Sequence, residues 1–206
     1  DVKKAGHGGV LADLRAVFEV VQPQVLYLHN PADKHDTHVA CCLRTIEAVR
    51  SLPKDKRPRR VLGCEIWRDL DWLNDADKQV LPVDRFKNLA ASLSGVYDSQ
   101  ITGGKRYDVA VAGRRTAHAS FFESHATDKA DALSFAMDLT PLVEDETLDV
   151  LDYTLGFLRR FENEVRDRFA RQADTGQTTG VDPQVDVLGD HWLSFATDLG
   201  TPLNQE

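Results

Sequence analysis

The chain lacks any long apolar segment. Its 206 residues contain no run of about 18 apolar residues, the length that a helix needs to cross a bilayer. The amino terminus also lacks the apolar core of a secretory signal peptide. We therefore expect no membrane-spanning helix and no membrane partner.

Positive charge is also in deficit. Lys and Arg number 25 against 33 Asp and Glu, which gives a net charge of −8. Because nucleic-acid binding depends on a clustered excess of Lys and Arg, this balance argues against a nucleic-acid partner. The one basic run, residues 54–60, contains Pro58 and no interleaved aromatic residue. It predicts a solvated loop between two elements.

Cysteine and methionine are scarce. Of the three cysteines, Cys41 and Cys42 fall in an apolar helical pattern and Cys64 in a strand-like run. This placement indicates buried thiols in a reducing compartment, so we expect a cytoplasmic protein. The single methionine is Met137, and the sequence opens on Asp1. We therefore expect processing or truncation upstream of Asp1.

What the chain does contain is an alternation of helical and strand-like patterns. Apolar residues recur at three-and-four spacing in residues 10–21 and 39–49, whereas residues 24–28 and 60–67 are short apolar runs. Helix, strand, helix, strand is the order that gives parallel strands joined by helical crossovers. The sequence thus predicts an α/β fold, with a Rossmann-like, mostly parallel sheet flanked by helices.

The chain divides into three parts. The length and a hydrophobic content of 42% suit one main core, and we assign residues 1–144 to it. Residues 145–171 carry an apolar stripe of helical period and predict a long C-terminal helix. Residues 172–206 begin polar and rich in Gly and Thr, and are expected to be linker and tail. Within the main part, two more helices and a strand are expected at residues 83–96, 109–122 and 133–139.

The residues after the first expected strand are rich in groups that bind metals. Three histidines, His29, His35 and His38, and the carboxylates Asp33 and Asp36 occur within ten residues. In a parallel sheet, sites form just beyond the carboxyl ends of strands. Asp33 is placed to cap the next helix, which would put His35 and His38 on one face of its first turn, where neutral imidazoles can bind a metal. The alternative is that both histidines are polar surface residues or caps.

Residues 25–49 resemble the second signature of the PIG-L/LmbE family of zinc-dependent deacetylases. That signature is usually written H-P-D-H, and here it reads His35-Asp36-Thr37-His38, after a buried strand and before an apolar helix. The resemblance covers roughly residues 8–143. It includes Tyr97-Asp98-Ser99-Gln100, which is similar to an aromatic-x-Ser-Gln motif of the family.

The resemblance implies roles for individual residues. His38 would bind zinc, and His35 would be a catalytic electrophile or acid beside the substrate carbonyl. This chain has Asp36 where the family usually has proline, and Thr37 where it usually has aspartate. A carboxylate behind the zinc ligand would therefore come from Asp33 or Asp36.

The family's first motif, A-H-P-D-D-E, does not occur in this sequence. In the family, that motif supplies two further zinc ligands and an aspartate that acts as general base. Catalytic zinc typically needs three protein ligands. We therefore expect either that the motif lies in an upstream segment or that the protein is an inactive relative.

Glu65, Trp67 and Arg68 lie at the end of the second expected strand and should face the same cleft. Arg68 would act in catalysis by binding the substrate, or would form a surface ion pair with Asp69 or Asp71. Trp67 and Trp72 would stack on a sugar, or would plug the core. Gln100 would bind substrate, or would cap its own turn.

One functional expectation follows, with alternatives beside it. The protein is expected to hydrolyse an N-acetyl amide on a sugar or sugar-like substrate, with zinc activating the attacking water. One alternative is an inactive relative that binds a glycan or a protein, and another is an interaction protein built around the long helix. The sequence leaves open the exact substrate and whether the chain forms a homo-oligomer.

Overall fold

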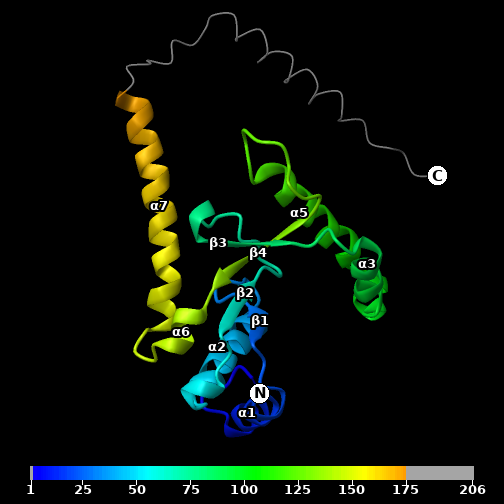
Figure 1. Ribbon diagram of the computed structural model, residues 1–206, viewed down its shortest axis with the longest axis vertical. Coiled ribbons are helices and arrows are strands. Elements are labelled where there is room, and N and C mark those ends of the chain that lie inside the picture. The colour runs from blue at the N-terminus through cyan, green and yellow to red at the C-terminus, as the bar shows by residue number, and fades with distance from the viewer. Residues whose placement is uncertain (1, 175–206) are drawn as a thin grey trace, which may run out of the picture. The chain divides into compact units, whose positions relative to one another are not determined.

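The computed structural model describes residues 2–174 of the chain (Figure 1). Contacts divide the chain into two units, Asp1–Asn163 and Glu164–Glu206. The division falls inside the last helix, α7 (Val150–Asp174). The predicted linker and tail lie almost wholly outside the described residues, so they stay a prediction.

A four-stranded sheet lies at the centre of the first unit (Figure 1). In spatial order its strands are β1 (Val25–His29), β2 (Arg60–Cys64), β4 (Leu133–Asp138) and β3 (Lys78–Pro82). β1 and β2 are parallel, whereas β4 runs antiparallel to both of its neighbours, β2 and β3. The predicted mixture of helices and strands is confirmed. The expectation of a mostly parallel sheet is wrong, because two of the three strand pairings are antiparallel.

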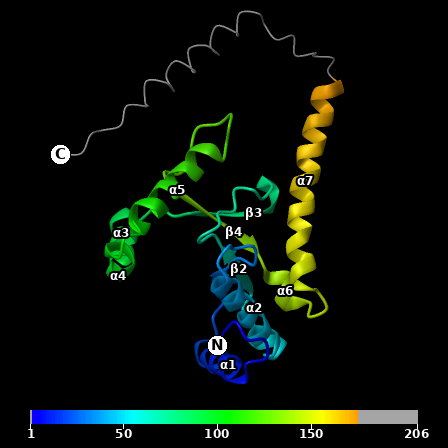
Figure 2. The ribbon, with the colours of Figure 1, turned by 180° about the vertical axis from the view of Figure 1, so that it is seen from behind.

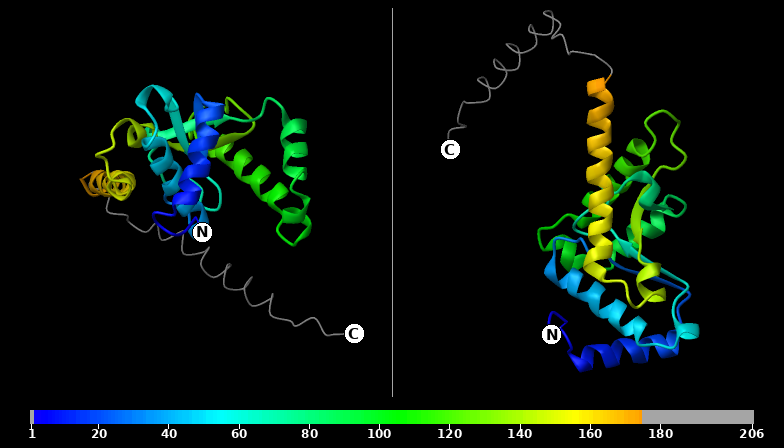
Figure 3. Two further views of the ribbon diagram at one scale, coloured as in Figure 1. Left: turned by 90° about the horizontal axis from the view of Figure 1, so that it is seen from below. Right: turned by 90° about the vertical axis from the view of Figure 1, so that its left-hand side faces the viewer.

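The five predicted helices are all found, together with two short helices that were not predicted. They are α1 (Gly8–Val21), α2 (Asp36–Arg50), α3 (Lys87–Gly95), α4 (Asp98–Thr102), α5 (Tyr107–Phe121), α6 (Thr140–Glu144) and α7, with short 3-10 helices at Lys54–Lys56 and Asp75–Asp77. The helix expected over residues 83–96 begins later, at Lys87, because β3 and a short extended connection precede it. α5 lies against β4 and α3 against α5 (Figure 2), while α1 runs along α2 (Figure 3).

The hydrophobic core forms where α2, β2, β4 and α6 meet, with α1 and α7 contributing at its edges. These elements bury apolar side chains that touch one another: Phe18, Ile46, Val49, Val61, Phe135, Met137, Leu142 and Phe157. The alternation of buried residues along a strand and the three-and-four spacing along a helix bring such positions to one side. The same packing fixes the strand ends on which the candidate site is built.

All three cysteines are free thiols. Burial, with a smaller contribution from Cys41, raises the pKa of Cys42 to about 12. Burial, with a smaller contribution from Glu65, raises the pKa of Cys64 to about 11. Both thiols are therefore protonated and unreactive at neutral pH, as expected of structural cysteines. Among residues 2–174, no helix combines the length and the apolar character that crossing a membrane requires.

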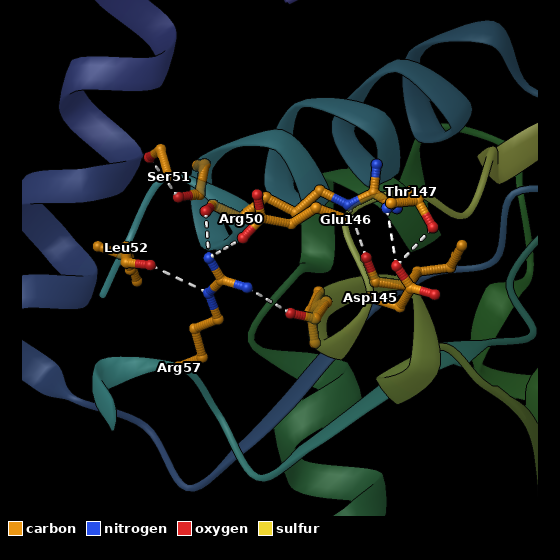
Figure 4. Close-up of polar contacts among 10 residues, drawn as sticks. Arg50, Ser51, Leu52, Arg57, Asp145, Glu146 and Thr147 are labelled. Carbon is orange, nitrogen blue, oxygen red and sulfur yellow. Dashed lines mark hydrogen bonds and ion pairs between the residues drawn. The ribbon is translucent and has the colours of Figure 1, made fainter. Parts of the chain in front are cut away.

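The basic run after α2 is not simply a solvated loop, because Arg57 turns inward. Its side chain is 8% exposed. The guanidinium donates hydrogen bonds to the carbonyl oxygens of Leu52 (3.0 Å), Val143 (2.8 Å) and Arg50 (2.5 Å), and it pairs with Glu146 (2.5 Å) (Figure 4). The last carbonyls of a helix have no partner within the helix. Arg57 therefore ties the end of α2 to the end of α6.

Candidate functional site

The site is built on the loop that leaves β1, and a buried asparagine holds this loop at the end of β2. Asn30 is fully buried. Its backbone N–H (3.2 Å) and its side-chain Nδ2 (2.9 Å) both donate to the carbonyl oxygen of Cys64. A Cβ atom on the neighbouring Gly63 would lie 3.1 Å from Asn30 Cα and 2.7 Å from Leu139 Cδ1. Glycine is therefore needed there for the loop to pass over β2 at this distance.

Asp33 connects the two strand-end loops. Its carboxylate is fully buried, and Oδ1 accepts the backbone N–H of His35 (2.9 Å). Its Oδ2 accepts the N–H groups of Trp67 (3.1 Å) and Arg68 (3.4 Å), which follow β2. Burial alone would raise the pKa of Asp33, but these backbone hydrogen bonds outweigh it and the pKa is lowered. Asp33 does not cap α2 as predicted, because the residue at the N-cap is His35.

The three histidines form a stack of imidazole rings. The rings of His29 and His38 lie 4.1 Å apart with an angle of 4° between their planes, and those of His35 and His38 lie 4.6 Å apart at 27°. His38 is thus the middle ring, and its Nδ1 lies 3.6 Å from Asp33 Oδ1. Burial, followed by the neighbouring His38, lowers the pKa of His29. The expectation that His35 and His38 lie together is met, because their rings are in contact.

The described residues fit one ligand of a metal centre and not a whole centre. A histidine that binds a metal usually turns its other ring nitrogen toward a carboxylate. In His38 it is Nδ1 that faces Asp33, so Nε2 is the nitrogen left for a metal. Parallel rings, however, present their nitrogens side by side rather than toward one point. In agreement with this geometry, residues 2–174 contain no group of three or more His, Cys, Asp or Glu side chains that could hold a metal ion.

Two predicted residues lie away from this buried cluster. The Asp36 side chain is 90% exposed, and its nearest ion-pair partner is Lys3 at 4.0 Å. Asp33 therefore fits the position of the carboxylate behind His38, and Asp36 does not. Arg68 is exposed and contributes its backbone N–H to Asp33. The arginines that line the adjacent pocket are Arg114 and Arg115 of α5.

A pocket of about 430 Å³ opens beside His38, between the strand ends and α5. Its size lies within the range of small-molecule sites. Its polar and aromatic lining comprises His38, Glu65, Trp67, Gln100, Tyr107, Arg114, Arg115 and Ser134. The structure thus brings three predicted residues, His38, Trp67 and Gln100, into one pocket. The His35 ring contacts the His38 ring and lies 6.0 Å from the Trp67 ring.

The two candidate tryptophans behave differently. Trp67 is partly exposed and lines the pocket. Its ring lies 6.2 Å from that of Tyr107, and the Lys105 ammonium lies 5.4 Å from its centroid. Trp72 instead packs against the core and donates its ring N–H to the carbonyl oxygen of Asp69. Trp67 is therefore the tryptophan available to a ligand in this pocket.

A larger hollow of about 640 Å³ lies between α3 and α5. Its lining is mostly small and apolar, with residues such as Ala90, Ala91 and Ala112, and it includes none of the predicted site residues. Catalysis and polar recognition need convergent polar groups. The pocket beside His38 is therefore the stronger candidate, although it is smaller.

Glu65, which lines that pocket, belongs to a buried pair of side chains that was only half predicted. Glu65 and His118 are both largely buried, with His118 Nδ1 3.3 Å from Glu65 Oε1. The His118 ring stacks on Phe135 at 4.1 Å. Glu65 was expected to face the cleft, whereas His118 was not predicted. The available signal was a histidine among the apolar residues of the expected helix 109–122.

No protein-family model, no curated protein and no solved structure matches this chain. The resemblance to the PIG-L/LmbE deacetylases therefore stays a prediction that rests on the quoted motifs. The arrangement of side chains must carry the functional argument by itself.

Glu65 should make stability depend on pH in the acid range. Burial alone would raise its pKa, but the His118 side chain, the Phe135 N–H and the Ser134 hydroxyl together lower it below the ordinary value of 4.5. A carboxylate whose pKa is lowered by folding stabilises the fold above its unfolded pKa, and this contribution is lost as the pH falls through the folded pKa. The free energy of unfolding of the protein minus that of Glu65→Gln should therefore decrease between about pH 6 and about pH 3. Urea unfolding of both proteins over this pH range measures the difference. A difference that does not change with pH would contradict the lowered pKa of Glu65.

Proposed function

We propose that this chain belongs to a zinc-dependent enzyme that hydrolyses an N-acetyl amide on a sugar or sugar-like substrate. The observation that carries the proposal is the position of His38. Its Nδ1 faces the buried carboxylate of Asp33, and its ring lines a pocket together with Trp67 and Gln100. A ligand histidine, a carboxylate behind it and a substrate pocket in front of it are the parts that such a site needs.

Different residues of the site would have different roles in the reaction. His38 would hold the metal through Nε2, and Asp33 would orient the ring and increase its basicity. When bound, zinc supplies an activated water at neutral pH and polarises the amide carbonyl. His35, exposed beside His38, would donate a proton to the departing amine or a hydrogen bond to the carbonyl oxygen.

A guanidinium would assist at the same carbonyl. The sequence assigns this role to Arg68, whose backbone is fixed by Asp33. The other metal ligands and the general base do not occur as a group among residues 2–174. They would come from elsewhere in the natural protein, which is consistent with the expected upstream motif.

Metal content of histidine variants tests the proposal. In the natural full-length protein, His38→Ala should lose stoichiometric zinc, because it removes a ligand. His35→Ala should retain zinc and lose turnover of an N-acetyl sugar by about a hundredfold or more. Elemental analysis and an assay for released acetate measure the two effects. His125→Ala, which removes an exposed histidine, is the matched control and should change neither. Full zinc in His38→Ala would refute the assignment.

A second candidate is a non-catalytic module that binds a glycan or a protein in the same pocket. It is favoured by the lack of a three-ligand group among the described residues. This candidate predicts that the purified full-length protein contains no transition metal and releases no acetate. For such a module, the protein would still bind a sugar in the presence of a chelator.

A further inference from the structure

Glu65 lines the pocket and carries a carboxylate oxygen that no described group satisfies. Its side chain is 4% exposed. Oε1 accepts hydrogen bonds from the Ser134 hydroxyl (3.0 Å) and the Phe135 N–H (3.1 Å), and lies beside His118. Oε2 is buried and has no hydrogen-bond partner among residues 2–174. Glu65 nevertheless belongs to the lining of the pocket.

An unpaired oxygen on a buried carboxylate is costly, so a group at such a position needs a donor. The contacts of Oε1 hold the carboxylate in place and favour its ionised form. Oε2 is therefore an unsatisfied acceptor of fixed position on a residue that lines the pocket. The donor that it lacks would be a group of the bound ligand.

Arg115 is the complementary group. It is half-buried on α5 and lines the same pocket. Within residues 2–174 it makes no hydrogen bond and no ion pair, whereas its neighbour Arg114 donates to the carbonyl oxygen of Ile66 (2.6 Å). The pocket thus holds an unused acceptor and an unused donor of opposite charge. Trp67 adds an aromatic surface to the same lining.

These three groups select among ligand classes. An anion would be opposed by Glu65, and an ammonium group by Arg115, because like charges close together in a pocket repel. A hydroxyl group both donates and accepts, so neighbouring hydroxyls satisfy both side chains. A ring that carries hydroxyls on its edge and C–H groups on its faces can also pack on Trp67.

We propose that Glu65 and Arg115 form a hydroxyl-binding subsite for the sugar ring of the ligand, with Trp67 against the face of that ring. The choice of ligand rests on the proposed function, since the acetamide of the same sugar would lie toward His38. The subsite itself needs no metal. It assigns sugar specificity to β2 and α5, separately from the chemistry at the end of β1.

Binding of two acetamides in the presence of EDTA tests the subsite without turnover. The probes are N-acetylglucosamine and N-cyclohexylacetamide, which has the same amide and a six-membered ring but no ring hydroxyls. Titration calorimetry of the full-length protein should detect N-acetylglucosamine. Glu65→Gln, which puts a donor where Oε2 was, should weaken that binding roughly tenfold or more. It should leave the affinity for N-cyclohexylacetamide unchanged.

Two further variants separate recognition from folding. Arg115→Gln removes a side chain without a described partner, so it should fold normally and also weaken N-acetylglucosamine selectively. Glu19→Gln makes the same charge change as Glu65→Gln on α1, outside the pocket, and should bind like the unmodified protein. Equal weakening of both probes by Glu65→Gln and Arg115→Gln would overturn the subsite, as would an unmodified protein that does not bind N-acetylglucosamine. Selective weakening in a protein without zinc or turnover would support the subsite while refuting the deacetylase.

Discussion

Asp33→Asn is expected to lower the free energy of unfolding by about 3 kcal/mol. The buried carboxylate accepts three backbone N–H groups, from His35, Trp67 and Arg68. Asparagine keeps one acceptor oxygen. Its NH₂ group is a hydrogen-bond donor, so it cannot accept a hydrogen bond from the backbone N–H groups that it would face. At least one backbone donor would then lose its partner, and the charge that strengthens all three hydrogen bonds would be gone.

The matched control for this change is Asp36→Asn, three residues along the chain. The Asp36 side chain is 90% exposed, so its replacement should change stability by no more than about 0.5 kcal/mol. Urea unfolding followed by circular dichroism measures both variants. Under the proposed function, Asp33→Asn should also weaken zinc binding by the full-length protein about 10- to 100-fold, since it removes the carboxylate behind His38. Equal stability of the two variants would show that Asp33 does not tie the strand ends together.

The part of the fold nearest the site could be predicted because its signals are local. The short apolar run of β1, bounded by Pro23 and Pro31, and the helical spacing in α2 are read within one window of sequence. The spacing of His35 and His38 then predicts that their rings meet, and they do. Likewise, a buried β2 next to β1 follows from the alternation of helix and strand.

The direction of the later strands could not be predicted in the same way. β3 opens on Lys78 and Gln79, which do not indicate a strand, and its position is set by pairing with β4 more than fifty residues later. The Lys78 side chain is nevertheless 4% exposed, because it pairs with Asp75 (2.8 Å) and lies over the Phe135 ring. The partner Asp75 is local, but the burial of Lys78 depends on a ring more than fifty residues later, and such a contact leaves no local pattern in the sequence.

The candidate site likewise has one part that could be predicted from the sequence and one part that could not. The residues of one loop, Asp33, His35 and His38, could be found together because they are close in sequence. The contact of Glu65 with His118 joins β2 to α5, across more than fifty residues. Which arginines line the pocket also depends on where α5 packs, so the sequence pointed to Arg68 and not to Arg114 or Arg115. Contacts between distant elements therefore decide the α5 side of the candidate pocket.

Arg57→Ala is expected to destabilise the protein by about 3 kcal/mol, although the residue lies in a basic run that resembles a solvated loop. The guanidinium bonds three carbonyl oxygens at the ends of α2 and α6, as well as Glu146 (Figure 4). Truncation leaves these carbonyls without a donor in a region that is largely covered. Arg57→Lys should recover only part of the loss, because one ammonium group cannot reach carbonyls that a planar fork of five donors satisfies together.

Arg59→Ala is the control for this prediction, since it removes the same charge two residues away from an exposed side chain. It should change the free energy of unfolding by no more than about 0.5 kcal/mol. The three variants are compared by urea unfolding at two salt concentrations. A surface ion pair is screened by salt, whereas hydrogen bonds to buried carbonyls are screened much less. The deficit of Arg57→Ala should therefore persist at high salt, and a deficit that disappears there would assign the effect to the Glu146 pair alone.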